Sequence, residues 1–91
     1  MALRIEHTVQ VWKEGEAYVA RAIPLDVMSC GDTTEEARRN LSEAVALFVK
    51  TASEHGTLTE VLEECGYVQH DDEWRAPELV LSETVTQSVH P

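Results

Sequence analysis

Apolar and polar residues alternate at the start of the chain, which is the pattern of a β-strand with one buried face. Over residues 3–11 the odd positions are apolar or neutral and the even positions are polar. The segment KEGE at 13–16 supplies a short turn, and residues 16–23 are predicted to form a hairpin with the first strand. Pro24 interrupts this strand, so residues 26–30 are predicted as a short third strand, at an edge or as a quick return within a meander.

The next segment changes to the 3.6-residue period of an amphipathic helix. Thr33 and Glu36 have the spacing of a capping box, and Gly56 stands where a C′ residue ends a helix. These signals predict a long helix over residues 34–55 that covers one face of the sheet. Its apolar stripe, about 100° wide, consists of Ala37, Leu41, Ala44, Val45, Phe48 and Ala52.

The last third of the chain begins with the same signals, a capping-box spacing and a helix-ending glycine, but closer together. Thr57 and Glu60 have the spacing of a second capping box, and Gly66 is expected to close a short helix. Residues 67–69 have an extended pattern and the acidic segment 70–73 has the composition of a turn.

Beyond Pro77 the apolar residues again keep odd parity, which predicts at least one more strand. These residues are Leu79, Leu81, Val85 and Val89. The predicted order is β-β-β-α-α-β, an α+β fold with a small antiparallel-rich sheet and one long helix packed on one face. We expect residues 1–91 to form a single domain.

Charge and cysteine content narrow the class of protein. Seventeen acidic against seven basic residues give a net charge of −10, and no basic stripe offsets the repulsion from a phosphate backbone. Binding to nucleic acid by this chain alone is therefore not expected, whereas a basic protein partner is compatible with the charge, and acidity alone also favours solubility. Two cysteines without CxxC spacing, no signal-peptide h-region and no membrane-length apolar run indicate a cytoplasmic protein.

No arrangement of residues indicates a catalytic, cofactor or metal site, and we do not expect an enzyme. The four histidines form no HExxH or HxH motif, and His7 is expected to be a satisfied, partly buried side chain. Trp12 and Trp74 are either aromatic anchors at an interface or residues that close a small core. Leu47 and Val49 flank the helix stripe, so the short helix or a second subunit should cover them.

One ordered set of features resembles the HicB-like antitoxin family of bacterial toxin–antitoxin systems. The set begins with YVA at 18–20, continues through Pro24 and GDT at 31–33, and ends in a helix of the form EEA…NL.EA. The helix residues that carry the resemblance are Glu36, Ala37, Asn40, Leu41, Glu43 and Ala44. The ordered combination, rather than any single piece, is characteristic of the family.

The resemblance implies a partial RNase H-like fold of three antiparallel strands, a crossing helix and a further strand. It also implies a dimer or tetramer that holds a small basic mRNA-cleaving toxin of the HicA type and covers its catalytic face. This chain departs from the family pattern in a turn shortened to IPLD at 23–26. Only 25 residues follow Gly66, so no separate DNA-binding domain is expected.

Three hypotheses for function follow. The first is an antitoxin-type module that neutralises a toxin by occlusion, and the second is a stand-alone homo-oligomeric regulatory or scaffolding module without a toxin. The third is an RNase H-like nuclease, which requires clustered carboxylates. If a basic partner exists, its predicted binding residues are the acidic side chains Glu63, Glu64, Asp71, Asp72 and Glu73.

Overall fold

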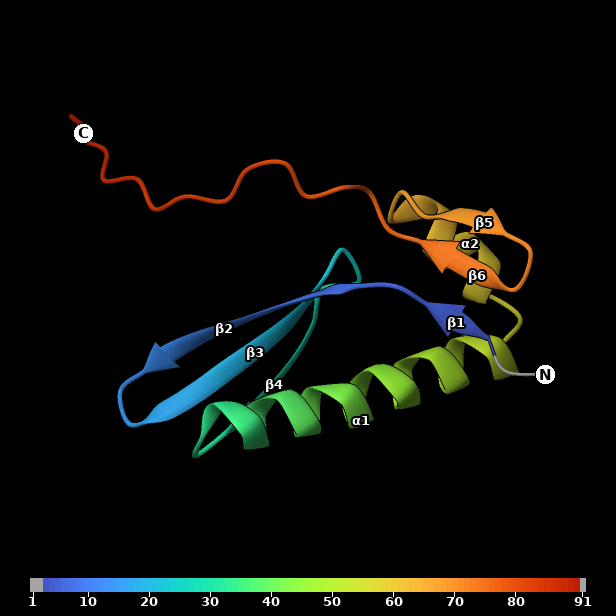
Figure 1. The fold of residues 1–91 in the computed structure, drawn as a ribbon, viewed down its shortest axis with the longest axis horizontal. Coiled ribbons are helices and arrows are strands. Elements are labelled where there is room, and N and C mark those ends of the chain that lie inside the picture. Colours follow the sequence, from blue (N-terminus) through green and yellow to red (C-terminus); the bar gives the residue numbers. More distant parts are fainter. Residues whose placement is uncertain (1–2, 91) are drawn as a thin grey trace.

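The computed structural model describes residues 3–90 and contains two small sheets and two helices (Figure 1). The α+β class and the single long helix are confirmed, but the predicted single sheet is divided into two three-stranded sheets. The elements in chain order are β1 (Arg4–Ile5), β2 (Thr8–Glu14), β3 (Ala17–Ile23), β4 (Val27–Gly31), α1 (Thr34–Glu54), α2 (Leu58–Glu64), β5 (Val68–His70) and β6 (Glu73–Arg75).

The larger sheet is the predicted antiparallel meander in the order β2-β3-β4. β3 lies at its centre, so β4 is the edge strand that the sequence pattern predicted. In the β2–β3 pairing Val11 lies opposite Ala20 and Val9 lies opposite Ala22, which fixes the side chains that face α1.

α1 packs on this sheet through its predicted stripe. Its buried residues are Ala37, Leu41, Val45 and Ala52, and Ala20 and Ala22 of β3 lie fully buried beneath them. At the start of the helix the approach is closer still: a Cβ atom on Gly31 would lie 2.6 Å from the amide nitrogen of Ala37. Only a residue without a side chain fits there.

The helix ends follow the predicted caps with one exception. The Thr33 side chain accepts a hydrogen bond from the amide of Glu36 at 3.0 Å, and Gly56 adopts a positive φ of 70° at the end of α1. The second predicted capping box is wrong, because the Thr57 hydroxyl makes no cap bond and instead donates to the carbonyl of Ala52 at 3.3 Å. Thr57 is already used in ending α1, since its amide also bonds to that carbonyl.

The predicted first strand is broken between residues 5 and 8. β1 leaves the meander and pairs in parallel with β6, which itself pairs antiparallel with β5. Glu6 lies at this break and joins the two sheets: its amide donates to the carbonyl of Trp74, and its carboxylate accepts from the amide of Ala76. The small sheet β1-β6-β5 and α2 gather at the C-terminal end of α1 (Figure 1).

The strand predicted beyond Pro77 does not form. Residues 76–90 have no regular secondary structure, and the last strand of the chain, β6, lies before the proline. In Figure 1 this C-terminal segment runs outward from β6 along the side of the meander that α1 does not cover. Within residues 3–90 no strand pairs with the backbone of this segment, although the side chain of Leu79 lies near Thr8 and Ile23.

Gly31 provides a test of the tight contact between α1 and the meander. We expect Gly31→Ala to lower the free energy of unfolding by about 1–3 kcal/mol, because the added methyl group overpacks against the helix backbone. Urea unfolding followed by circular dichroism measures the change. Gly15→Asn is the control, since no atom lies within 4 Å of a Cβ built at Gly15 and asparagine tolerates the φ of 62° there. Equal stability of the two variants would contradict the close approach.

Candidate functional site

The acidic character of the chain is concentrated in its C-terminal structural unit. Residues 57–76, which comprise α2, β5 and β6 and are called the terminal unit here, contain six acidic residues and one arginine, a net charge of −5. The other 71 residues carry the remaining −5, so half of the net charge belongs to about a fifth of the chain. This end of the molecule therefore attracts cations.

All five predicted partner-binding residues belong to this unit by their positions in the sequence. Glu63 and Glu64 lie exposed on α2, and Asp71 and Asp72 lie exposed in the turn between β5 and β6. Glu73 differs, because it belongs to β6 and is partly covered.

Glu73 is the member of the set whose carboxylate is paired with arginines of the same chain. Its carboxylate lies 3.9 Å from the Arg4 guanidinium and 3.2 Å from Nε of Arg75. No ion pair involves the other four acids within residues 3–90. The sequence analysis missed Glu60, which is exposed on α2 and lies one turn before Glu63 and Glu64, a helical spacing that was readable from the sequence.

Buried aromatic residues attach the terminal unit to the rest of the fold. Trp74 and Tyr67 are buried with Leu62 in the core cluster, so the core interpretation of Trp74 is confirmed. The Tyr67 hydroxyl donates a hydrogen bond to the carbonyl of Glu6. Burial, with smaller contributions from Cys65 and Glu6, raises the pKa of Tyr67 from 10.0 to about 12. The exposed acidic residues therefore belong to a unit that is held to the core by buried side chains and by the hydrogen bond to Glu6.

A second feature is a groove between α1 and the N-terminal strands. α1 lies mainly over β3 and β4, which leaves Val9 on β2 partly exposed although it faces the helix side. His7 is half-buried in this groove, but its Nδ1 atom is buried without a hydrogen-bond partner, so the expectation of a satisfied histidine is wrong for that atom. The lining is mostly apolar and includes Leu3, Ile5, Val45, Ala46, Val49 and Leu58.

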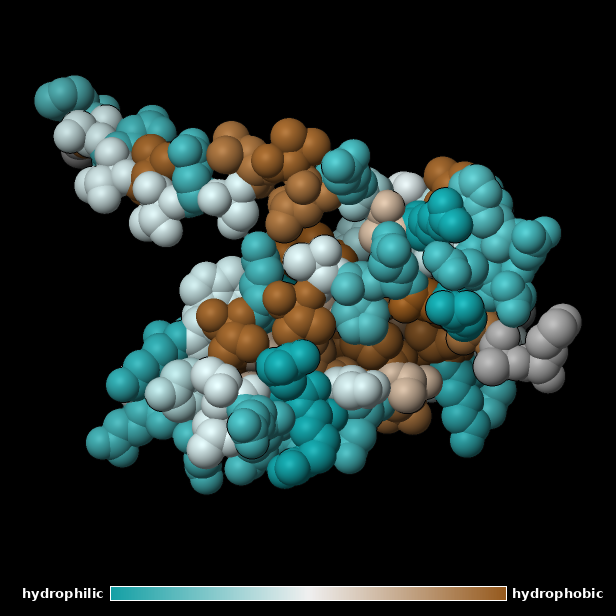
Figure 2. All heavy atoms as spheres, viewed as in Figure 1, coloured by the Kyte–Doolittle hydropathy of each residue, from teal (hydrophilic) through white to brown (hydrophobic). Residues whose placement is uncertain are grey.

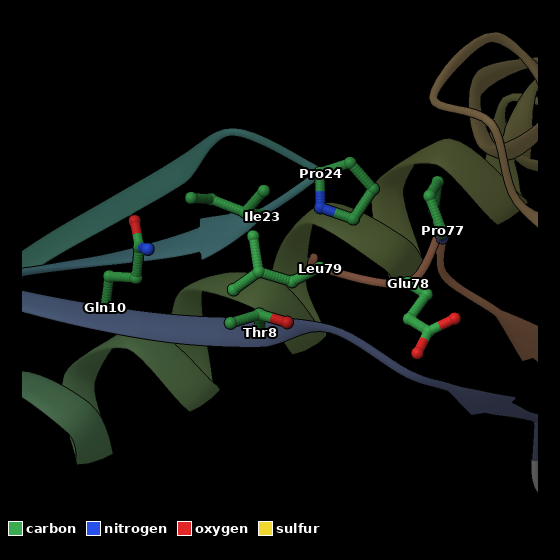
Figure 3. A pocket seen from close by; sticks show the side chains of 7 residues that line it. All are labelled: Thr8, Gln10, Ile23, Pro24, Pro77, Glu78 and Leu79. Atoms are coloured by element: carbon green, nitrogen blue, oxygen red, sulfur yellow. The ribbon is translucent and has the colours of Figure 1, made fainter. Parts of the chain in front are cut away.

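A third feature is the face of the β2-β3-β4 sheet opposite α1, called the outer face here. The strand registers place ten residues on it: Thr8, Gln10, Trp12, Glu14, Ala17, Val19, Arg21, Ile23, Met28 and Cys30. No helix or sheet covers this face (Figure 1). Trp12 is 45% exposed here, so of the two readings for this residue the core-closing one is wrong. Thr8 and Gln10 are half-buried, because Leu79 of the C-terminal segment lies near them (Figure 3).

Neither a metal cluster nor a disulfide is found among the described residues. Within residues 3–90 no three His, Cys, Asp or Glu side chains come together to hold a metal ion, the arrangement that the nuclease hypothesis requires. Cys30 is exposed on β4, Cys65 is half-buried after α2, and both are free thiols. None of the helices in this part of the chain combines the length and apolar character of a membrane span.

Comparison with known proteins gave no match to a family model, to a curated protein or to a solved structure. The similarity to HicB-like antitoxins therefore remains a prediction from the residues quoted above.

Tyr67 provides a test of the anchor beneath the terminal unit. Tyr67→Phe should cost about 1 kcal/mol of unfolding free energy near pH 8, because Glu6 loses a buried hydrogen bond. Since the folded-state pKa is raised to about 12, the wild-type phenol contributes its full stability below pH 10 and loses it between about pH 10 and 12.

The measurement is urea unfolding of both proteins at pH 8 and at pH 11. The stability difference between wild type and Tyr67→Phe should narrow at the higher pH. A difference that is the same at both pH values would show that the phenol is not protected in the folded protein.

Proposed function

We propose that this chain is a protein-binding module of the antitoxin type, which neutralises a small basic toxin by covering it. The observation that carries the proposal is the terminal unit, whose exposed carboxylates on α2 and in the β5–β6 turn are not paired with cations of the described chain. Such a surface attracts a basic protein and orients it during encounter.

The choice of a toxin as the basic partner comes from the resemblance to HicB-like proteins. The element order supports it to the extent that a three-stranded meander, a crossing helix and a later strand follow one another as the family pattern implies. The later strand, β6, returns to pair in parallel with β1 at the N-terminus. We propose that binding takes place in the bacterial cytoplasm and that this chain needs no nucleic-acid contact for it.

The second hypothesis, a homo-oligomeric module without a toxin, is favoured by a different observation. The outer face of the sheet is open, and Met28 on it is 57% exposed. Self-association and toxin binding would use different surfaces, so the two hypotheses make separate predictions.

Charge reversal on α2 tests the proposed partner surface. Glu63→Lys together with Glu64→Lys should slow association with a basic HicA-type protein encoded beside this chain by about tenfold, and should reduce the dependence of the rate on salt. Stopped-flow fluorescence at two ionic strengths measures both quantities. Inhibition of mRNA cleavage by the same partner reports occlusion.

The matched control is Glu16→Lys together with Glu43→Lys, which changes the net charge equally on exposed positions of the β2–β3 turn and of α1, away from the terminal unit. It should have a much smaller effect on the association rate. Equal slowing in both double variants would mean that net charge alone steers the partner, and an unchanged rate in both would refute the acidic surface. A genome with no small basic protein encoded next to this chain would favour the oligomeric hypothesis.

A further inference from the structure

The C-terminal segment has a strand-like sequence but pairs with no strand among residues 3–90. Leu81, Val85 and Val89 are all about two-thirds or more exposed, and Val80 is exposed further still. A β-branched and apolar pattern with period two gains stability only when one of its faces is buried. Figure 2 shows hydrophobic side chains along the first part of this segment, whose later part stands away from the body.

The start of the segment, at Ala76 and Pro77, is held in place, so the direction in which the segment leaves β6 is defined. The Ala76 amide donates to the Glu6 carboxylate at 3.1 Å, and the ring of Pro77 lies against Gly66. Leu79 then turns its side chain between Thr8 and Ile23, at the margin of the outer face (Figure 3). The residues beyond Leu79 leave the sheet without contacting it closely, as their exposure shows.

The outer face itself is suited to burial against another layer. Trp12, Val19, Ile23 and Met28 make it largely apolar, and of its ten residues only Glu14, beside the β2–β3 turn, is acidic. Its single cation, Arg21, is paired with Asp26 at 2.6 Å. In a chain of net charge −10, two copies approach most readily through a surface low in carboxylates, and the outer face has one carboxylate among ten residues.

We propose that the protein forms a twofold dimer in which the outer faces pack together and residues 80–89 of each copy cross onto the sheet of the other. The occupant is a second copy rather than a foreign chain, because the unpaired strand-like segment and the uncovered sheet face belong to the same molecule and adjoin at Leu79. Reciprocal exchange of this kind is isologous and closes on itself. The exchange buries both the outer face and the apolar residues of the C-terminal segment. This dimer is a property beyond toxin binding and does not require it.

Mass measurement of single-residue variants tests the dimer and its surface. Wild type should have twice the 10.2 kDa of one chain by light scattering, whereas Met28→Glu on the outer face and Leu81→Glu on the segment should each have the mass of one chain. Leu47→Glu is the matched control, because Leu47 is equally exposed but lies on α1, and it should remain dimeric. All three positions are exposed, so the variants should keep the wild-type circular dichroism.

Each other result overturns the proposal. A wild type that stays monomeric as its concentration is raised shows that the outer face is covered by something other than a second copy. A dimer that survives Met28→Glu, or is lost in Leu47→Glu, uses another surface. Dissociation by Met28→Glu but not by Leu81→Glu shows that the segment takes no part.

Disulfide capture decides whether the segment crosses between copies. Cys30 is exposed on the outer face, so a chain with Val85→Cys and Cys65→Ser has one thiol on the face and one on the segment. Oxidation of crossed copies should join two chains and double the mass under denaturing, non-reducing conditions. A disulfide closed within one chain, no disulfide, or doubling that persists after Cys30→Ser would each overturn the crossing.

Discussion

The close approach of α1 to the meander through small residues is the constraint on which the other features depend. Ala20 and Ala22 on β3 face Ala37 and Leu41 on the helix, and Gly31 brings the end of β4 against the first turn of α1. Small side chains on both the helix and the sheet allow their backbones to come close. The apolar residues between them are therefore enclosed. Such close packing matters in a chain of 91 residues because the core is small.

The position of that contact determines which surfaces remain open. Because α1 lies over β3 and β4, its last turns extend beyond the meander and need a second support. β1, β6 and α2 provide it, with Leu62, Tyr67 and Trp74 continuing the same core. The strand predicted at the N-terminus is therefore divided, with β1 in the smaller sheet and β2 in the meander. The hydrogen bonds of Glu6 hold the chain at this division. The groove beside β2 and the uncovered outer face follow from this offset.

Local signals in the sequence predicted those parts of the fold that are decided by neighbours along the chain. The meander, the stripe on α1, the Thr33 cap and both helix-ending glycines are of this kind. The errors concern partners distant in sequence: the division of the first strand, the pairing of β1 with β6 and the absence of a sheet partner beyond Pro77. A period-two pattern shows that a segment suits a sheet, but it does not show which sheet is within reach. Of the candidate site, the charge and the nearby Arg75 were readable, whereas the ion pair of Glu73 with Arg4 joins residues some seventy positions apart.

The two proposed surfaces depend on different forces, and salt separates them. Attraction between the terminal unit and a basic partner is Coulombic across water, so it weakens as the Debye length falls below about 10 Å. Burial of Met28, Trp12 and the apolar residues of the C-terminal segment removes hydrocarbon from water, and screening by salt does not oppose it. Screening in fact reduces the repulsion between two chains of net charge −10. Raising the ionic strength should therefore weaken association with a basic partner while favouring self-association, a pair of opposite responses that no single shared surface would produce.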